Sequence, residues 1–150
     1  MKLEKEIQQV KGFRNDYHRA AVNLIFTGKW VIQLHSDIFK PYHLTTQQYN
    51  ILRILRGQYP KATTVKLIRD RMLDRMSDAS RIVELLRKKK LVERTIQQLD
   101  RRKMDVIITD KGLQLLKEID AKENERMDNY LNKLDAAEIN QLNFLLDKLR

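Results

Sequence analysis

Basic side chains gather in the middle of this sequence, where residues 69 to 103 contain 12 lysines and arginines but only 6 acidic residues. Three of them, Arg101 to Lys103, are adjacent and lie between two segments rich in β-branched residues. Adjacent cations repel one another unless they face a strip of negative charge, such as the phosphates of a DNA duplex. The pattern favours a surface that binds a polyanion, with a solvated polar turn as the alternative for these three residues taken alone.

The same region supplies candidates for reading bases. Ser80 and Arg81 are the predicted major-groove contacts, because arginine commonly binds guanine edges, although a phosphate contact is equally open to both. Arg75 and Ser77 are expected at backbone phosphates, and the lysines from Lys88 onward should raise affinity without reading sequence. The predicted DNA-binding residues are Arg75, Ser77, Ser80, Arg81, Lys88, Arg101, Arg102 and Lys103.

Other kinds of site find little support in the composition. The chain has no cysteine, which excludes thiol catalysis and thiolate metal sites. Its three histidines, His18, His35 and His43, have no spacing typical of zinc ligands. No catalytic triad spacing or glycine-rich phosphate loop stands out. We therefore expect no metal, no cofactor and no enzymatic activity.

Helical periodicity extends over most of the chain of 150 residues. It predicts one long helix from Phe13 to Lys40, ended by Pro41. Thr45 should then cap a helix that runs to about Gly57, with Gln48 completing a capping box. Thr63 or Thr64 should cap a third helix that ends near Met72.

A fourth helix is predicted from about Ser77 to Lys90, with a basic outer face, so that the third and fourth helices form a helix-turn-helix. Asp78 on that face could accept from a cytosine amine, but the preferred interpretation is that it favours the helix N-terminus. Alternation at 92–96 and at 104–108 predicts a β-hairpin with residues 97–103 at its tip. Thr109 should cap a long helix to about Asn132, and a last helix should follow.

The segment DRRKMDVIITDKG, from Asp100 to Gly112, resembles the wing signature D-x-R-x-x-x-V-x-[LI]-T-x-x-G of the multiple-antibiotic-resistance regulator (MarR) family. The preceding SRIVELLRKKKLVER is similar to that family's recognition helix, and FKPYHLTTQQYNILRIL to its first helix junction. The family usually has glycine before the recognition helix and Lys-Gly before Leu-Val. This chain has Leu73 and Lys89-Lys90 there, so Asp74 or Ser77 could serve as the cap of the fourth helix.

The resemblance implies a mainly α fold with a small β-hairpin wing. Within a single domain, a winged helix-turn-helix lobe at about 45–109 would lie between dimerisation helices at about 1–40 and 110–150. It implies a homodimeric, ligand-responsive repressor that binds a pseudo-palindromic operator in double-stranded DNA. A winged-helix module that binds protein instead of DNA is the alternative. Without an apolar run long enough to span a membrane, we expect a cytoplasmic protein.

Effectors of this family are often small aromatic anions that bind between the dimer helices and the DNA-binding lobe. In this chain the corresponding residues would be Trp30, Tyr42, His43 and Tyr49, with Arg53 nearby. The resemblance therefore implies a pocket for a small aromatic or anionic effector. Ordinary packing of these aromatic residues is the alternative and is the preferred one.

Overall fold

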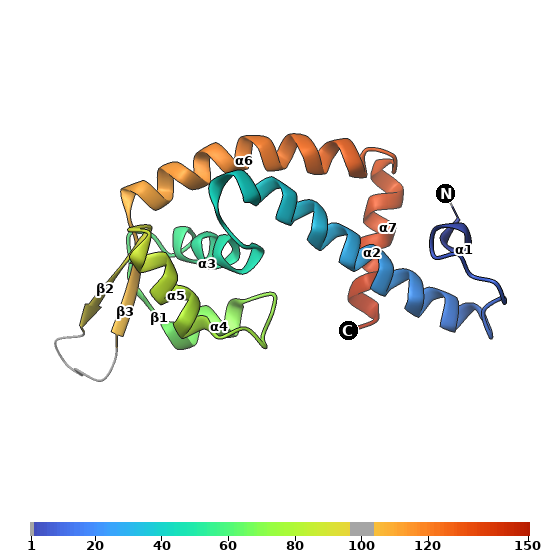
Figure 1. Ribbon diagram of the computed structural model, residues 1–150, viewed down its shortest axis with the longest axis horizontal. Helices are drawn as coiled ribbons and strands as arrows, with labels where there is room; N and C mark the ends of the chain where they lie inside the picture. The colour runs from blue at the N-terminus through green and yellow to red at the C-terminus, as the bar shows by residue number, and fades with distance from the viewer. Residues whose placement is uncertain (1, 97–103) are drawn as a thin grey trace. The chain divides into compact units, whose positions relative to one another are not determined.

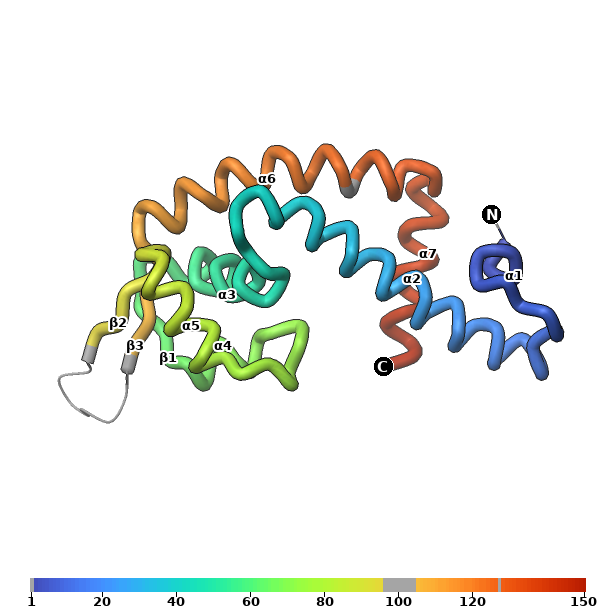
Figure 2. The backbone as a smooth tube through the Cα atoms, in the orientation of Figure 1, coloured from blue at the N-terminus to red at the C-terminus, as the bar shows by residue number. Residues whose placement is uncertain are grey.

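The computed structural model describes residues 2–96 and 104–150 and divides the chain into two compact units, Met1–Thr46 and Gln47–Arg150. Figures 1 and 2 show the elements of each unit. The described residues are mostly helical, with one small sheet, which confirms the predicted fold class. No helix among these residues is long and apolar enough to cross a bilayer.

The first unit contains α1 (Leu3–Glu6), α2 (Asp16–Phe39) and the short 3-10 helix η1 (Lys40–Tyr42). The predicted long helix is confirmed, but it begins three residues later than Phe13, because the Asn15 side chain caps it by accepting from the His18 amide at 2.9 Å. The sequence did not predict α1. It buries Leu3, and Glu4 pairs with Arg19 of α2 at 2.7 Å.

The described residues of the second unit form five helices. They are α3 (Thr46–Arg56), α4 (Val65–Arg71), α5 (Ala79–Lys88), α6 (Asp110–Leu131) and α7 (Ala136–Lys148). Two predicted helix caps are confirmed. Thr64 caps α4 by accepting from the Leu67 amide, and Thr109 caps α6 by accepting from the Gly112 amide. The most deeply buried side chains come from α3 to α6 and the sheet: Ile51, Leu52, Leu55, Ile68, Val83, Leu86, Val92, Val106, Leu116 and Ile119.

The sheet has three antiparallel strands in the order β1-β3-β2, formed by β1 (Thr63–Thr64), β2 (Val92–Ile96) and β3 (Met104–Ile108). The predicted hairpin is confirmed, with Val92 opposite Ile108. The two-residue β1 was not predicted, because its pairing with β3 is not a local feature. The predicted tip, with Arg101, Arg102 and Lys103, lies outside the described residues.

The start of α5 differs from the prediction. The helix begins at Ala79 instead of Ser77, and its cap is Asp78, whose Oδ1 accepts from the Arg81 amide at 3.0 Å. Neither of the caps that we considered, Asp74 or Ser77, holds that position. Asp78 thus stabilises the N-terminus of α5, which is the interpretation that we preferred from the sequence.

The end of α5 is tied to the start of α6 through the turn at Lys90. Lys90 has a φ of 61°, and the Leu91 amide donates to the Leu86 carbonyl at 3.0 Å, which is a Schellman motif. The Thr109 hydroxyl donates to the Lys90 carbonyl at 2.9 Å, and the Thr109 amide donates to the Leu91 carbonyl at 3.1 Å. These bonds fix the base of the hairpin against the two helices.

Lys90 occupies a left-handed conformation that glycine adopts without cost, so Lys90→Gly should raise the free energy of unfolding by about 0.5–1 kcal/mol. The matched control is Lys88→Gly in the last turn of α5. This substitution should lower the free energy of unfolding by about 0.5–1 kcal/mol. Urea unfolding followed by circular dichroism measures both. Equal losses in the two variants would contradict the role assigned to the turn.

Candidate nucleic-acid interface

The turn between α4 and α5 is built around Asp74. Its Oδ2 accepts from the Ser77 hydroxyl at 2.7 Å, and its Oδ1 accepts from the Met76 amide at 3.1 Å. These two donors, the hydroxyl first, hold the pKa of the Asp74 carboxyl below its usual value. The Leu73 amide donates to Asn50 Oδ1 of α3 at 3.0 Å. The turn is thus a defined structure that sets where α5 begins.

One face of α5 is buried and the opposite face is exposed. Ala79, Val83 and Leu86 are almost completely buried, at three- and four-residue steps. The exposed face carries Ser80, Arg81 and Lys88, all predicted as DNA contacts, and Arg75 is exposed on the preceding turn. Ser77 is half-buried and donates its hydroxyl to Asp74. The structure therefore brings the five predicted residues that it describes to the turn and to α5.

Sequence reasoning missed Arg94, which connects the hairpin to α5. Its NH2 donates to the Ser80 carbonyl at 3.3 Å, and its NH1 lies 3.5 Å from Glu84 Oε2. Arg94 has the same strand parity as Val92, which is buried. A charged residue at an inward position of an alternating strand was the available signal. Arg94 is a positioning residue, since it holds β2 against α5.

Glu84 also engages a second arginine on its own helix. Arg87 donates to both carboxylate oxygens, with NH2 to Oε1 at 2.8 Å and Nε to Oε2 at 3.0 Å. This hydrogen-bonded pair lowers the pKa of Glu84 and raises that of Arg87. The charge of Arg87 is therefore largely compensated, which distinguishes it from Arg81 six residues earlier.

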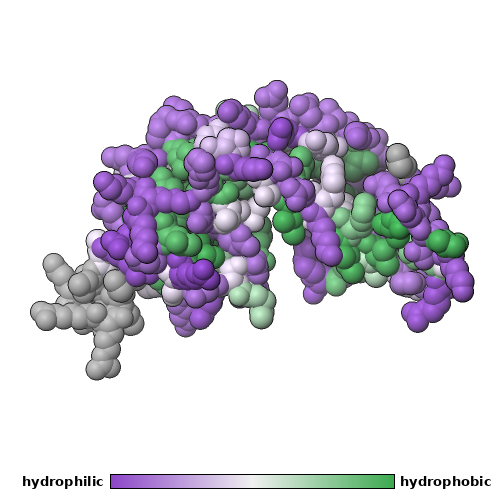
Figure 3. All heavy atoms as spheres, in the orientation of Figure 1, coloured by the Kyte–Doolittle hydropathy of each residue, from purple (hydrophilic) through white to green (hydrophobic). Residues whose placement is uncertain are grey.

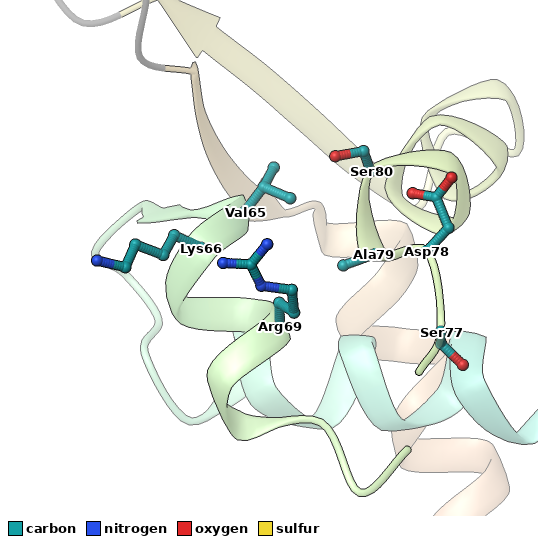
Figure 4. A pocket seen from close by; sticks show the side chains of 7 residues that line it. All are labelled: Val65, Lys66, Arg69, Ser77, Asp78, Ala79 and Ser80. Atoms are coloured by element: carbon teal, nitrogen blue, oxygen red, sulfur yellow. The ribbon is translucent and has the colours of Figure 1, made fainter. Parts of the chain in front are cut away.

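A pocket of about 360 Å³ lies between α4 and the N-terminal end of α5 (Figure 4). Its lining includes two cations of α4, Lys66 and Arg69, together with Ser77, whose hydroxyl donates to Asp74, and Ser80. In Figure 4 the Arg69 guanidinium lies on the α4 side of the pocket, beside Val65 and Lys66. Neither Lys66 nor Arg69 was among the predicted site residues, although their three-residue spacing places them on one helix face.

A second polar cluster joins α3 to α6. The Tyr49 hydroxyl contacts Glu123 at hydrogen-bond range, and Arg53 NH1 donates to Tyr49 Oη at 3.2 Å. Arg56 donates to Asp120 Oδ2 at 2.5 Å. Burial first, and then the bond to Glu123, raises the pKa of Tyr49 well above its usual value, so this phenol stays protonated.

The residues predicted to line an effector pocket are distributed over both units. Tyr49 and Arg53 lie together on α3 and are already engaged with the carboxylate of Glu123. Trp30 on α2 is 43% exposed, Tyr42 lies in η1, and His43 caps η1 with a φ of 53°. No three His, Asp or Glu side chains of the described residues lie close enough together to hold a metal ion.

Comparison with known proteins gives structural matches only: no protein-family model and no curated protein sequence matches the chain. A MarR transcription factor from Planctomyces limnophilus is 29% identical, with a TM-score of 0.70 over 93% of this chain and 98% of that one. BpsR of Bordetella bronchiseptica, whose DNA binding is regulated by 6-hydroxynicotinic acid, is 21% identical, with a TM-score of 0.79 over 92% and 97%. MepR of S. aureus in its DNA complex is 20% identical, with a TM-score of 0.78 over 86% and 94%.

Proposed function

We propose that this chain, which is a winged helix-turn-helix protein of the MarR type, is a transcription regulator that binds double-stranded DNA in a sequence-specific manner. The observation that carries the proposal is α5, which buries one face in the core and exposes Ser80, Arg81 and Lys88 on the other. A helix presented in this way fits the major groove, where arginine can bind guanine edges. MepR, a structural neighbour, has been solved as a DNA complex.

The hairpin would act beside α5 as a wing. Its paired strands are anchored by Arg94 to Ser80 and Glu84, so the hairpin and α5 would approach DNA as one body. Arg101, Arg102 and Lys103 lie outside the described residues, and their part rests on the charge pattern of the sequence. We assign them to phosphates or to the minor groove, where an AT-rich sequence has its most negative potential.

The protein would act as a homodimer on a pseudo-palindromic operator. In the second unit, the end of α6, the turn after it, and α7 with its C-cap residue expose large apolar side chains: Tyr130, Leu131, Leu134, Leu142, Phe144, Leu145 and Leu149. Figure 3 shows hydrophobic side chains among the hydrophilic ones on the face of the molecule that it draws. An exposed apolar surface of this size is typical of a partner interface. Two-fold symmetry would then repeat α5 at matching half-sites.

Leu145→Glu should separate the two subunits, because it would place a charge in the apolar interface. Light scattering of the wild type should give twice the 18.0 kDa of one chain. We expect the variant to weaken dimerisation at least about tenfold. The matched control Asn143→Glu, at an exposed polar position of α7, should stay dimeric. A wild-type protein that is monomeric at micromolar concentration would contradict this assignment.

We further propose that a small aromatic or anionic effector lowers operator affinity, which would make the regulator a ligand-responsive repressor. BpsR provides the parallel, since 6-hydroxynicotinic acid regulates its DNA binding. In this chain Arg53 presents a half-exposed guanidinium beside the buried ring of Tyr49. An effector carboxylate would have to compete with Glu123 for Arg53, and its differential affinity would shift the conformational equilibrium.

The alternative is a winged-helix module that binds a protein. Acidic residues near α5 would favour this alternative, but the structure uses three of them internally: Asp74 in the turn, Asp78 as the helix cap and Glu84 with Arg87 and Arg94. They do not form an acidic docking surface. The DNA-binding function is therefore the better supported of the two.

Selection of bound fragments from a random duplex pool tests the function. The purified protein should enrich one motif made of two inverted half-sites, with centres about 10 base pairs or a multiple apart. Recovery of fragments without any common motif would contradict sequence-specific recognition.

A further inference from the structure

We propose that the pocket between α4 and α5 is a phosphate-binding notch that holds one phosphate of the DNA backbone, with Arg69 as its principal ligand. This inference rests on the proposed DNA-binding function and deepens it, because it assigns a contact to a helix that carried none of the predicted DNA-binding residues. The notch is defined by Lys66 and Arg69 of α4 and Ser80 of α5.

The pocket has the size and lining that a phosphate group requires. Its volume of about 360 Å³ accommodates a phosphate with part of its flanking sugars. Arg69 lines it from α4, and Ser80 lines it from the first turn of α5 (Figure 4). A guanidinium offers two parallel donors to phosphate oxygens, and a hydroxyl adds a third. An anion would therefore meet donors from both helices.

Arg69 is available for such a contact. Its Nε lies 3.9 Å from Asp70 Oδ1, which is a long and solvent-exposed pairing of little strength. Within 2–96 and 104–150 its terminal nitrogens make no hydrogen bond, whereas Arg87 is bound to Glu84. Lys66 extends from the same helix and, within those ranges, is in no ion pair; its flexible chain would let the ammonium follow a phosphate.

Among the described residues that line the pocket, Asp78 is the one that is acidic, and its position limits its effect. Its Oδ1 accepts from the Arg81 amide as the cap of α5. In Figure 4 its carboxylate points away from Arg69. The anion would thus face the Arg69 and Ser80 side of the pocket. This placement also agrees with helix-turn-helix docking, in which the first helix crosses the DNA backbone while the second enters the groove.

The test compares Arg69→Gln with Arg71→Gln, which removes the same charge two residues later on α4 and outside the notch. Fluorescence anisotropy measures the affinity of the full-length protein for the selected duplex and for a scrambled one. Because each dimer would lose two such contacts, Arg69→Gln should weaken both about 60-fold at 0.1 M salt and reduce the log–log salt slope by about two. Arg71→Gln should have a clearly smaller effect, and both variants should unfold at the same temperature as the wild type.

Neutral methylphosphonates at single backbone positions locate the contact. Methylphosphonate at one position of each half-site should lower the affinity of the wild type. The same substitution should cause no further loss of affinity in Arg69→Gln. Equal effects of Arg69→Gln and Arg71→Gln, with Arg81→Ala still weakening the selected duplex, would overturn the notch and leave the proposed function intact. A wild type that binds no duplex would overturn both.

Discussion

Gly112→Ala is expected to lower the free energy of unfolding by about 3 kcal/mol, near the upper end of overpacking effects. A Cβ at this position would lie 2.5 Å from the Leu91 carbonyl oxygen and 2.7 Å from Ile108 Cγ1. The first contact is with backbone, so it cannot be relieved by a side-chain rotation. Gly112 thus permits α6 to start directly against the end of α5 and the base of β3.

Urea unfolding followed by circular dichroism measures the effect. The matched control is Gly57→Ala in the same unit, where the nearest atoms to a Cβ are carbonyl oxygens at 3.5 and 3.6 Å. It should change stability by no more than about 0.5 kcal/mol. If Gly112→Ala were as stable as Gly57→Ala, the close packing at this junction would be refuted. Because the junction also holds the hairpin base, the variant should weaken DNA binding as well.

Arg81→Ala is expected to have the largest effect on recognition, lowering operator affinity by about 1–3 kcal/mol and relaxing specificity at one base position of each half-site. Arg81 lies in the first turn of α5, and its side chain is exposed. Its amide is held by Asp78, which fixes the backbone from which the guanidinium extends.

Arg87→Ala is the matched control on the same helix, since Arg87 is engaged by Glu84 in a two-point contact. Gel-shift titrations at fixed salt should show a change below about threefold for Arg87→Ala and at least fivefold for Arg81→Ala. Repeating the fragment selection with each variant separates base reading from phosphate contact. A uniform loss over all sequences for Arg81→Ala would place it at the backbone and not at a base edge.

Local rules predicted much of the fold. Thr64 and Thr109 are caps as expected, because the donors they satisfy lie three residues away. The alternation of residues along 92–96 and 104–108 predicted β2 and β3 correctly, because a hairpin is also a local structure. The predicted start of α5, at about Ser77, was wrong, because Asp74, Ser77 and Asp78 are all polar residues that could cap a helix there. Ser77 bonds to Asp74, and Asp78 takes the cap.

Non-local contacts could not be predicted. Glu123 lies on α6, and its partners Tyr49 and Arg53 come from α3, some seventy residues earlier. Neither the pairing of β1 with β3 nor the notch at Arg69 has a sequence signature, since each depends on where two separate elements meet. The exposed face of α5 was predicted because helical periodicity fixes which side chains share a face.

The affinity for the selected duplex as a function of salt tests the central claim most directly. A winged helix that contacts several phosphates in each subunit should bind the selected duplex at least about 10³-fold more tightly than a scrambled one. Its affinity should fall linearly on a log–log plot, by about 10³-fold or more between 50 and 200 mM salt. If the two duplexes bound with equal affinity that did not depend on salt, or if neither bound at 50 mM salt, sequence-specific DNA binding would be contradicted.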